Sequence, residues 1–462
     1  MEAPPIINVT EGVDSPEQRS PVGWLALGII FFLLIVGNLV SYLQRDDKAE
    51  TKVIPAYETV LRQSIKTSAM ETYLKQMSPQ APSRVDPKAT LDGPISVLVT
   101  KREKEPLAGL YYAVMRAEQG KEVTAKDLSF IRESKEPALV AAADLYAAKN
   151  SGKVAELAKA LPEDGFVYRL AKVQALDRLG EPAERKKVVE EVNVPLFLAS
   201  TVILGGAILG GIIAIVVFFV IRGSGKMQIR GYPGTGMSPA AADRLALRCA
   251  MLFGAWLVSE LVVVMLARAL NVPEGVDRVI SAAVLILMVP LSLQVPVLGE
   301  RLEWNRFFPK GRTASDILVG AAAALGNLPI IFTLAILGQA LFSFLPSPEH
   351  PLTTELMSDK SAATVSLALF AGAIVAPIFE EFMFRGHLFP ALAARKNLMF
   401  GAIFSSFLFA AIHPTGVPAW PALMGLAAMG CALTYVRGSL VPCIAMHAVH
   451  NLLTLIVAIG IA

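Results

Sequence analysis

The sequence has little cysteine and little net charge, and each shortage excludes a class of protein. Only three cysteines occur in 462 residues, and Cys249, Cys431 and Cys443 all fall in apolar segments. A disulfide framework is therefore excluded for the polar segment 44–193, which contains none. The net charge of +3 is too small to suggest nucleic acid as a partner, and no glycine-rich phosphate-binding loop is present.

Apolar residues are what the chain has in excess. They make up 54% of it, and the mean hydropathy of +0.53 is higher than the core of a soluble domain requires. Runs long enough to cross a bilayer number about nine, and we expect eight to ten spans. The runs cover residues 22–43, 194–222, 244–268, 279–298, 316–344, 362–381, 398–413, 418–436 and 440–462. The sequence thus predicts an all-α, polytopic membrane helix bundle.

Basic residues on the short connections set the expected orientation. With the runs alternating across the membrane, twelve Lys and Arg fall on one side, and only Arg268, Arg278 and Lys360 on the other. The side richer in basic residues is expected to be cytoplasmic. The first run is too long for a secretory signal and no cleavage site follows it. The chain therefore divides into a cytoplasmic tail (1–21), an anchor (22–43), an extracytoplasmic domain (44–193) and a multi-span domain (194–462).

The inserted segment 44–193 is expected to be a soluble helical domain. Apolar residues recur at helical spacing in 110–115, 138–148 and 166–179, and Gly120 and Gly180 follow such stretches in the manner of helix ends. Such a domain would serve as a spacer, or bind the substrate or a partner protein.

The end of the chain contains polar side chains that apolar segments rarely carry. They are Glu380, Glu381, Arg385, His413, His447 and Asn451. Holding each alone in a bilayer would be costly, so together they indicate one buried chemical site. On a helix Glu381 can pair with Arg385 four residues on, whereas Glu380 is turned by about 100° and is left to face something else.

Two further positions add to this site. His447 and Asn451 are four residues apart, so their nitrogen donors can face one small volume. His413 precedes Pro414 and must lie near a helix end.

The spacing of these residues resembles a known family. Glu-Glu-x-x-x-Arg at 380–385, Phe-x-x-x-His at 409–413 and His-x-x-x-Asn at 447–451 are similar to the three motifs of the CAAX protease and bacteriocin-processing family, also called Abi proteins. The resemblance covers about 360–458, which would be the protease core, and leaves 1–193 outside. It implies an intramembrane glutamic endopeptidase.

The resemblance also implies a role for each residue. Glu380 would activate a water with help from His413, and His447 and Asn451 would stabilise the oxyanion. Glu381 and Arg385 would support them. This mechanism requires no cofactor and no metal.

Two other functions fit the same residues. A zinc-dependent protease could use Glu380, His413 and His447 as ligands, although no His-Glu-x-x-His pair exists. A proton-coupled transporter could use the buried Glu and His set as a relay, but it would be expected to show two similar halves. A scaffold with a vestigial site would have lost part of the motifs, and none is lost.

The expected substrate is a membrane-associated protein or peptide, cut at a peptide bond or C-terminal tag near the bilayer. Composition leans towards a bacterial protein, which places the chain in the inner (plasma) membrane. One difficulty arises: if 362–381 and 398–413 each cross once, Glu380 and His413 reach opposite faces, roughly 25–30 Å apart. Either the first helix continues to Arg395, or one segment is kinked or half-inserted, with Pro377 as a candidate kink.

Overall fold

The structure, a computed structural model, is helical throughout its described part. It describes residues 20–44, 53–77, 89–162, 165–191, 194–225, 231, 237–272, 275–342, 345 and 361–461. Within these ranges there are helices and no β-strand. The chain is an all-α, polytopic membrane protein, which confirms the predicted fold class. The predicted tail 1–21 falls almost wholly outside the described residues.

The chain forms two compact units. One contains residues up to Leu43 and Gly206–Leu455, and the other contains Gln44–Gly205 together with the residues from Ile456. We call them the membrane unit and the helical unit.

The helical unit is built from one long helix and seven shorter ones around its own core. Its helices are α2 (Val53–Met77), α3 (Asp92–Lys101), α4 (Pro106–Glu118), α5 (Ala125–Arg132), α6 (Pro137–Leu145), α7 (Ser151–Ala158), α8 (Phe166–Arg178) and α9 (Ala183–Glu191). The core includes the buried Leu110, Tyr111 and Leu170. Gly120 and Gly180 lie just beyond α4 and α8 with positive φ, as expected of residues that end helices.

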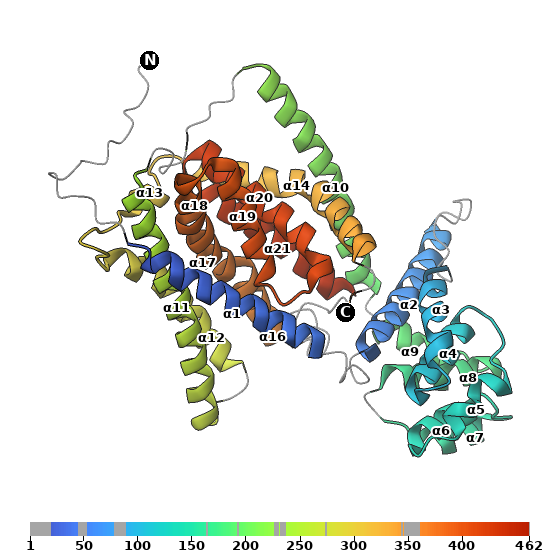
Figure 1. Cartoon of the computed structure of the whole chain (residues 1–462). Coiled ribbons are helices and arrows are strands. Elements are labelled where there is room, and N and C mark those ends of the chain that lie inside the picture. The colour runs from blue at the N-terminus through green and yellow to red at the C-terminus, as the bar shows by residue number, and fades with distance from the viewer. Residues whose placement is uncertain are drawn as a thin grey trace. The chain divides into compact units, whose positions relative to one another are not determined.

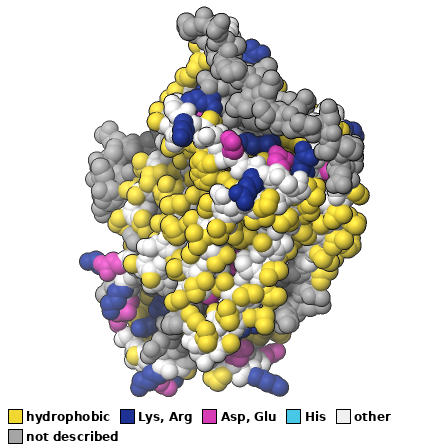
Figure 2. Space-filling view, turned by 90° about the vertical axis from the view of Figure 1, so that its left-hand side faces the viewer, with side chains coloured by type: hydrophobic (Ala, Val, Ile, Leu, Met, Phe, Trp, Pro, Cys, Tyr) yellow, Lys and Arg dark blue, Asp and Glu magenta, His cyan; other side chains and the backbone are white. Residues whose placement is uncertain are grey.

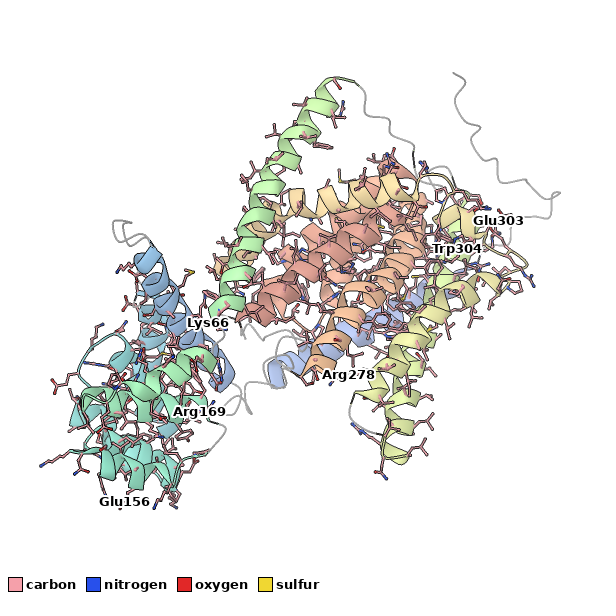
Figure 3. The ribbon with its side chains drawn as sticks, turned by 180° about the vertical axis from the view of Figure 1, so that it is seen from behind. Lys66, Glu156, Arg169, Arg278, Glu303 and Trp304 are labelled. Atoms are coloured by element: carbon pink, nitrogen blue, oxygen red, sulfur yellow. The ribbon has the colours of Figure 1, made fainter. Side chains whose placement is uncertain are left out.

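A buried lysine joins the end of the chain to the helical unit. Lys66, labelled in Figure 3, is 1% exposed, and its Nζ donates to the carbonyl of Gly460 at 2.9 Å. A cation at the carboxyl end of a helix interacts favourably with the helix dipole. This contact is one that ties the last residues of α21 to the helical unit.

The membrane unit contains the long apolar helices. They are α1 (Val22–Gln44), α11 (Pro239–Ala269), α12 (Val276–Gln294), α14 (Thr313–Leu341), α20 (Trp420–Arg437), the composite helix Ala362–Arg395, and the larger parts of α10 (Val194–Gly223) and α21 (Val441–Ile461), of which α10 begins and α21 ends in the helical unit. Eight helices in the described part are thus long and apolar enough to cross a membrane. The remaining predicted run, 398–413, is α19 (Leu398–Ala411), which has 14 residues. Figure 1 shows α18, α19, α20 and α21 as neighbouring rods.

Charged side chains gather at one end of this unit. On the face in Figure 2, hydrophobic side chains form a broad band, with charged ones along its upper edge and others at its lower left and bottom. Asp243 accepts from Trp24 Nε1 at 2.9 Å and lies 3.8 Å from Arg395. Arg437 pairs with Asp316 at 2.5 Å. The two groups are connected, because Arg244 of α11 pairs with Glu300 at 2.7 Å and Leu440, just after α20, donates to the carbonyl of Phe307 at 2.9 Å. The starts of α1, α11 and α14 and the ends of α18 and α20 therefore lie at one end of the bundle, which we call the basic end.

The composite helix runs through two widened turns. Its parts are α16 (Ala362–Phe370), a π turn (Ala371–Val375), α17 (Ala376–Met383), a second π turn (Phe384–Leu388) and α18 (Phe389–Arg395). Each π turn ends two residues before a proline, Pro377 or Pro390. A proline cannot donate and clashes with the carbonyl four residues back, and a wider turn relieves both problems. The apolar run was expected to end at residue 381, and the helix instead continues to Arg395, as the first of the two alternatives had it.

Because the composite helix continues to Arg395 and α19 is short, Glu380 and His413 do not lie at opposite faces of the membrane. Glu380 lies fifteen residues before Arg395, and His413 lies fifteen residues after Leu398. At about 1.5 Å per residue both positions are roughly 20 Å from the basic end. Since α19 is only about 21 Å long, it ends inside a hydrocarbon layer of about 30 Å.

The orientation of the chain remains a prediction that cysteine labelling can test. We expect Asn150→Cys, in the helical unit, to react with an impermeant thiol reagent in intact cells, and Phe308→Cys, at the basic end, to be protected. The three native cysteines are buried and should give little background. The reverse pattern would place the helical unit in the cytoplasm.

Candidate active site

Three predicted residues from three segments meet around one small volume. Glu380 comes from α17, His413 from the turn after α19, and His447 from α21. The Nε2 atoms of His413 and His447 lie 4.0 and 3.9 Å from Glu380 Oε2. These separations are too long for direct hydrogen bonds and suit a bridging water about 2.8 Å from each atom. The side chains of Glu380 and His413 are 24% and 18% exposed, whereas His447 is 4% exposed.

Both histidines present the same ring nitrogen to Glu380. His413 Nδ1 donates to the carbonyl of Phe409 at 2.5 Å, and His447 Nδ1 donates to Glu381 Oε1 at 2.8 Å. Because both acceptors are oxygens without hydrogen, each Nδ1 carries the proton. In its neutral form each ring then points an unprotonated Nε2 at the volume beside Glu380.

The second glutamate lies behind the first and anchors His447. Arg385 Nη1 donates to Glu381 Oε1 at 3.0 Å, and both side chains are 1% exposed. The predicted pair is therefore formed, and its carboxylate also orients a histidine. A carboxylate on Nδ1 fixes the tautomer and stabilises the imidazolium if Nε2 takes up a proton.

Phe409 and Gly430 complete the packing around Arg385. The guanidinium lies 4.7 Å from the centre of the Phe409 ring, and a Cβ at Gly430 would stand 3.0 Å from Arg385 Nε. The Phe409 ring is also 4.5 Å from that of His413 and 5.8 Å from that of His447. One aromatic ring thus contacts three charged or polar residues of the site.

The site lies nearer to the end of the bundle opposite the basic end. A Cβ on Gly338 of α14 would be 2.2 Å from the carbonyl of Pro418, in the turn that follows His413. From Asp316 to Gly338 α14 rises about 33 Å, so this turn lies at the far end. His413 lies roughly 20 Å from the basic end, so it is closer to the far end of the bundle than to the basic end.

Comparison with known proteins identifies this part of the chain. Residues 362–453 match the family model described as Rce1-like, type II CAAX prenyl endopeptidase. They form an Rce1-like domain. This confirms the resemblance found in the three motifs, and the match leaves α1, the helical unit and α10 to α14 outside it.

Two other comparisons add less. An uncharacterized 24.3 kDa protein of Escherichia coli is 34% identical over 98 residues, which are 21% of this chain and 43% of that protein. The chain thus spans less than half of the length of this relative. No solved structure matches.

Asn451 of the Rce1-like domain lies on the expected helix but has a different partner. Its Nδ2 donates to the carbonyl of Gly372 at 2.7 Å. In the π turn Ala376 N–H bonds to Ala371, and the next donor in that register would be Pro377, which has no N–H. Asn451 therefore supplies the donor that Gly372 lacks, and one of its two amide N–H groups is used.

Sequence reasoning missed three contributions to the site. It did not link Glu381 to His447, it gave Phe409 no role beyond the motif, and it passed over Gly430. The adjacency of two glutamates was the available signal, because only one of them can face the same way as Arg385. Gly430 gives no signal in the sequence, since its importance is the space that it leaves for a side chain on another helix.

The distances from Glu380 to His413 and His447 are longer than those between the ligands of a zinc ion. Tetrahedral ligands about 2.05 Å from zinc are roughly 3.3 Å apart, so Glu380 Oε2 would have to approach both histidines by more than half an ångström. In the described part of the chain no group of three or more His, Cys, Asp or Glu is arranged to hold a metal.

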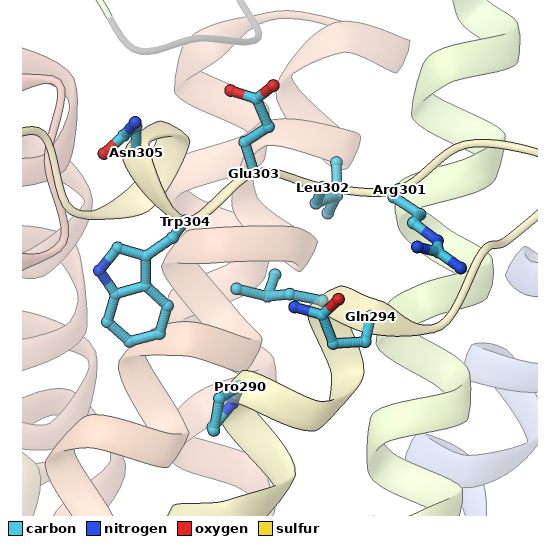
Figure 4. Close-up of a pocket in the computed structure, with 8 residues that line it drawn as sticks. Pro290, Gln294, Arg301, Leu302, Glu303, Trp304 and Asn305 are labelled. Carbon is cyan, nitrogen blue, oxygen red and sulfur yellow. The ribbon is translucent and has the colours of Figure 1, made fainter.

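A separate cleft of about 490 Å³ opens at the basic end, beside α12 and α13 (Trp304–Phe307). Figure 4 shows Gln294, Arg301, Glu303 and Trp304 around it, and it contains none of the predicted site residues.

Proposed function

We propose that the chain is an intramembrane endopeptidase that hydrolyses a peptide bond with a water activated by Glu380. The observation that carries the proposal is the convergence of Glu380, His413 and His447 at 3.9–4.0 Å inside an apolar bundle. The Rce1-like domain supports protease activity in general.

The chemistry follows from the groups around the water. Glu380 takes one proton from the water as its oxygen attacks the carbonyl carbon of the substrate, and His413 orients the water through Nε2. The oxyanion of the tetrahedral intermediate faces His447, whose protonated ring is stabilised by Glu381. The proton on Glu380 then passes to the leaving nitrogen, the C–N bond breaks, and a carboxylic acid and an amine are released.

Asn451 has a modified role in this scheme. Its bond to Gly372 holds the π turn that precedes Glu380, so it braces the carboxylate. Its second amide N–H can still serve as an oxyanion donor, the role that the motif implies.

The depth of the site favours a substrate cut close to one membrane face. The far end of the bundle is extracytoplasmic in the orientation that the basic residues predict. We therefore propose a peptide or C-terminal tag of a membrane-associated protein as substrate, cut near the outer face of a bacterial inner membrane. The helical unit would bind the substrate or a partner protein on that side.

Comparing membrane proteins from cells carrying wild-type protein or Glu380→Ala tests the function directly. Substrates should accumulate in the variant at their uncut length, and their new termini should be found only with the wild type. Ion-driven uptake that is lost in Glu380→Ala, with every membrane protein at the same length in both strains, would favour the transporter instead.

Chelation separates the glutamate mechanism from the zinc alternative. We expect cleavage by the purified protein to survive thorough chelation, because the proposed steps need only protein groups and water. Elemental analysis of the active protein should give less than one metal ion per chain. Loss of activity that zinc alone restores would make Glu380, His413 and His447 ligands.

A further inference from the structure

α1 lies outside the Rce1-like domain in sequence, yet it contacts the catalytic helices. Phe31 lies 4.9 Å from the ring of Phe253 and 6.2 Å from that of Phe384, which packs at 5.1 Å on Phe409. A Cβ on Gly23 would be 2.3 Å from the backbone of Leu247, so α1 and α11 are in close contact. α1 is therefore packed into the membrane unit rather than standing apart as an anchor.

One polar side chain of α1 reaches the end of α19. Asn38 Nδ2 donates to the carbonyl of Ile412 at 2.6 Å and lies 3.5 Å from that of Ala411. Because carbonyl oxygens only accept, the amide nitrogen must be the atom that faces them. Asn38 is fourteen residues after Trp24, so it is about 21 Å from the basic end, at the depth of His413.

The end of α19 has few other donors. A helix leaves its last four carbonyls without partners, and within a bilayer no water replaces them. Pro414 has no N–H for Ala410, which accepts instead from His413 N at 3.1 Å. Phe409 accepts from the His413 ring. Asn38 meets the carbonyls of Ala411 and Ile412.

The bond from Asn38 fixes the peptide group that carries His413. The carbonyl of Ile412 and the N–H of His413 belong to one planar unit. Its oxygen is held by Asn38 and its nitrogen by Ala410, so the plane has little freedom to turn. That plane and the bond from His413 Nδ1 to the carbonyl of Phe409 together direct the ring towards Glu380.

We propose that Asn38 is a positioning residue, through which α1 sets His413 Nε2 against Glu380. This proposal rests on the proposed function for its effect on catalysis. The contact of Asn38 with Ile412 predicts the position of the His413 ring, and this prediction holds whether or not a substrate is cut.

The test compares Asn38→Leu and Asn38→Asp with the wild type. Leucine has a similar size and cannot donate, so kcat should fall roughly 10- to 100-fold with little change in KM, as misplacement of a catalytic group does. Aspartate can donate only when protonated. Its activity relative to wild type should therefore rise as the pH is lowered. A general loss of stability would not make the activity of Asn38→Asp relative to wild type rise at lower pH.

The ring resonances of His413 test the role of Asn38 independently of the proposed function. The chain has five histidines, and the ring resonances of His413 can be assigned by their loss in His413→Gln. We expect them to shift in Asn38→Leu and to stay in place in Leu39→Ala, a change at a 41% exposed neighbour. Unchanged His413 resonances in folded Asn38→Leu would overturn the proposal, even in a protein that cleaves. Shifted resonances in a wild type that cleaves nothing would support the contact and count against the protease.

Discussion

Replacing Glu380 by glutamine is expected to lower kcat for peptide cleavage by about 10³-fold or more, while the protein stays folded and inserted. Glutamine has the size of glutamate, but its neutral amide cannot take up the proton of the water. Oε2 of Glu380 has no hydrogen-bond partner among the described residues. Little stability therefore depends on it, and the loss should appear in turnover.

The matched control is Glu260→Gln. Glu260 is another carboxylate inside a span, and it accepts from Ser281 at 3.1 Å. We expect it to leave kcat within about twofold of wild type. Cleavage by Glu380→Gln at a rate similar to that of this control would remove Glu380 from the mechanism.

Replacing Arg385 by methionine should cause the largest loss of stability among changes in the site. Arg385 and Glu381 are both 1% exposed, and removing one partner leaves the other charge buried and unpaired. Breaking such a pair typically costs about 3–5 kcal/mol of the free energy of unfolding. Unfolding in detergent, followed by denaturant titration, measures the difference.

The double variant Glu381→Gln/Arg385→Met provides the control for this prediction. It removes both charges, and Gln can still accept from His447 Nδ1. We expect it to recover most of the stability that Arg385→Met loses, because the unpaired charge is gone. A double variant as unstable as Arg385→Met would show that packing against Phe409 and Gly430, not charge, makes Arg385 necessary.

The sequence by itself determined the class of the protein and the candidate residues of a buried site. Long apolar runs cannot be soluble helices in such number, and lone Glu and His in them require partners. The Glu381 and Arg385 pairing followed from helical periodicity alone, because residues four apart on a helix are neighbours.

The tertiary structure decided how deep the site lies and what holds it. The run that includes Glu380 looked as if it ended at 381, because Arg385 and His387 interrupt the apolar pattern. Both residues are buried by other helices, so the span continues to Arg395. The partner of Asn451 is a carbonyl released by a π turn, and no local pattern predicts where a turn widens.

The contact of α1 with the end of α19 is the clearest example of a feature that the sequence pattern could not predict. Composition made residues 22–43 an anchor, and that prediction concerned the bilayer only. Asn38 and Ile412 are separated by 374 residues, and their contact depends on two helices starting at one level and running for the same length. Such a match of lengths arises only when the helices are packed, because periodicity reports the face of a helix and not its neighbour.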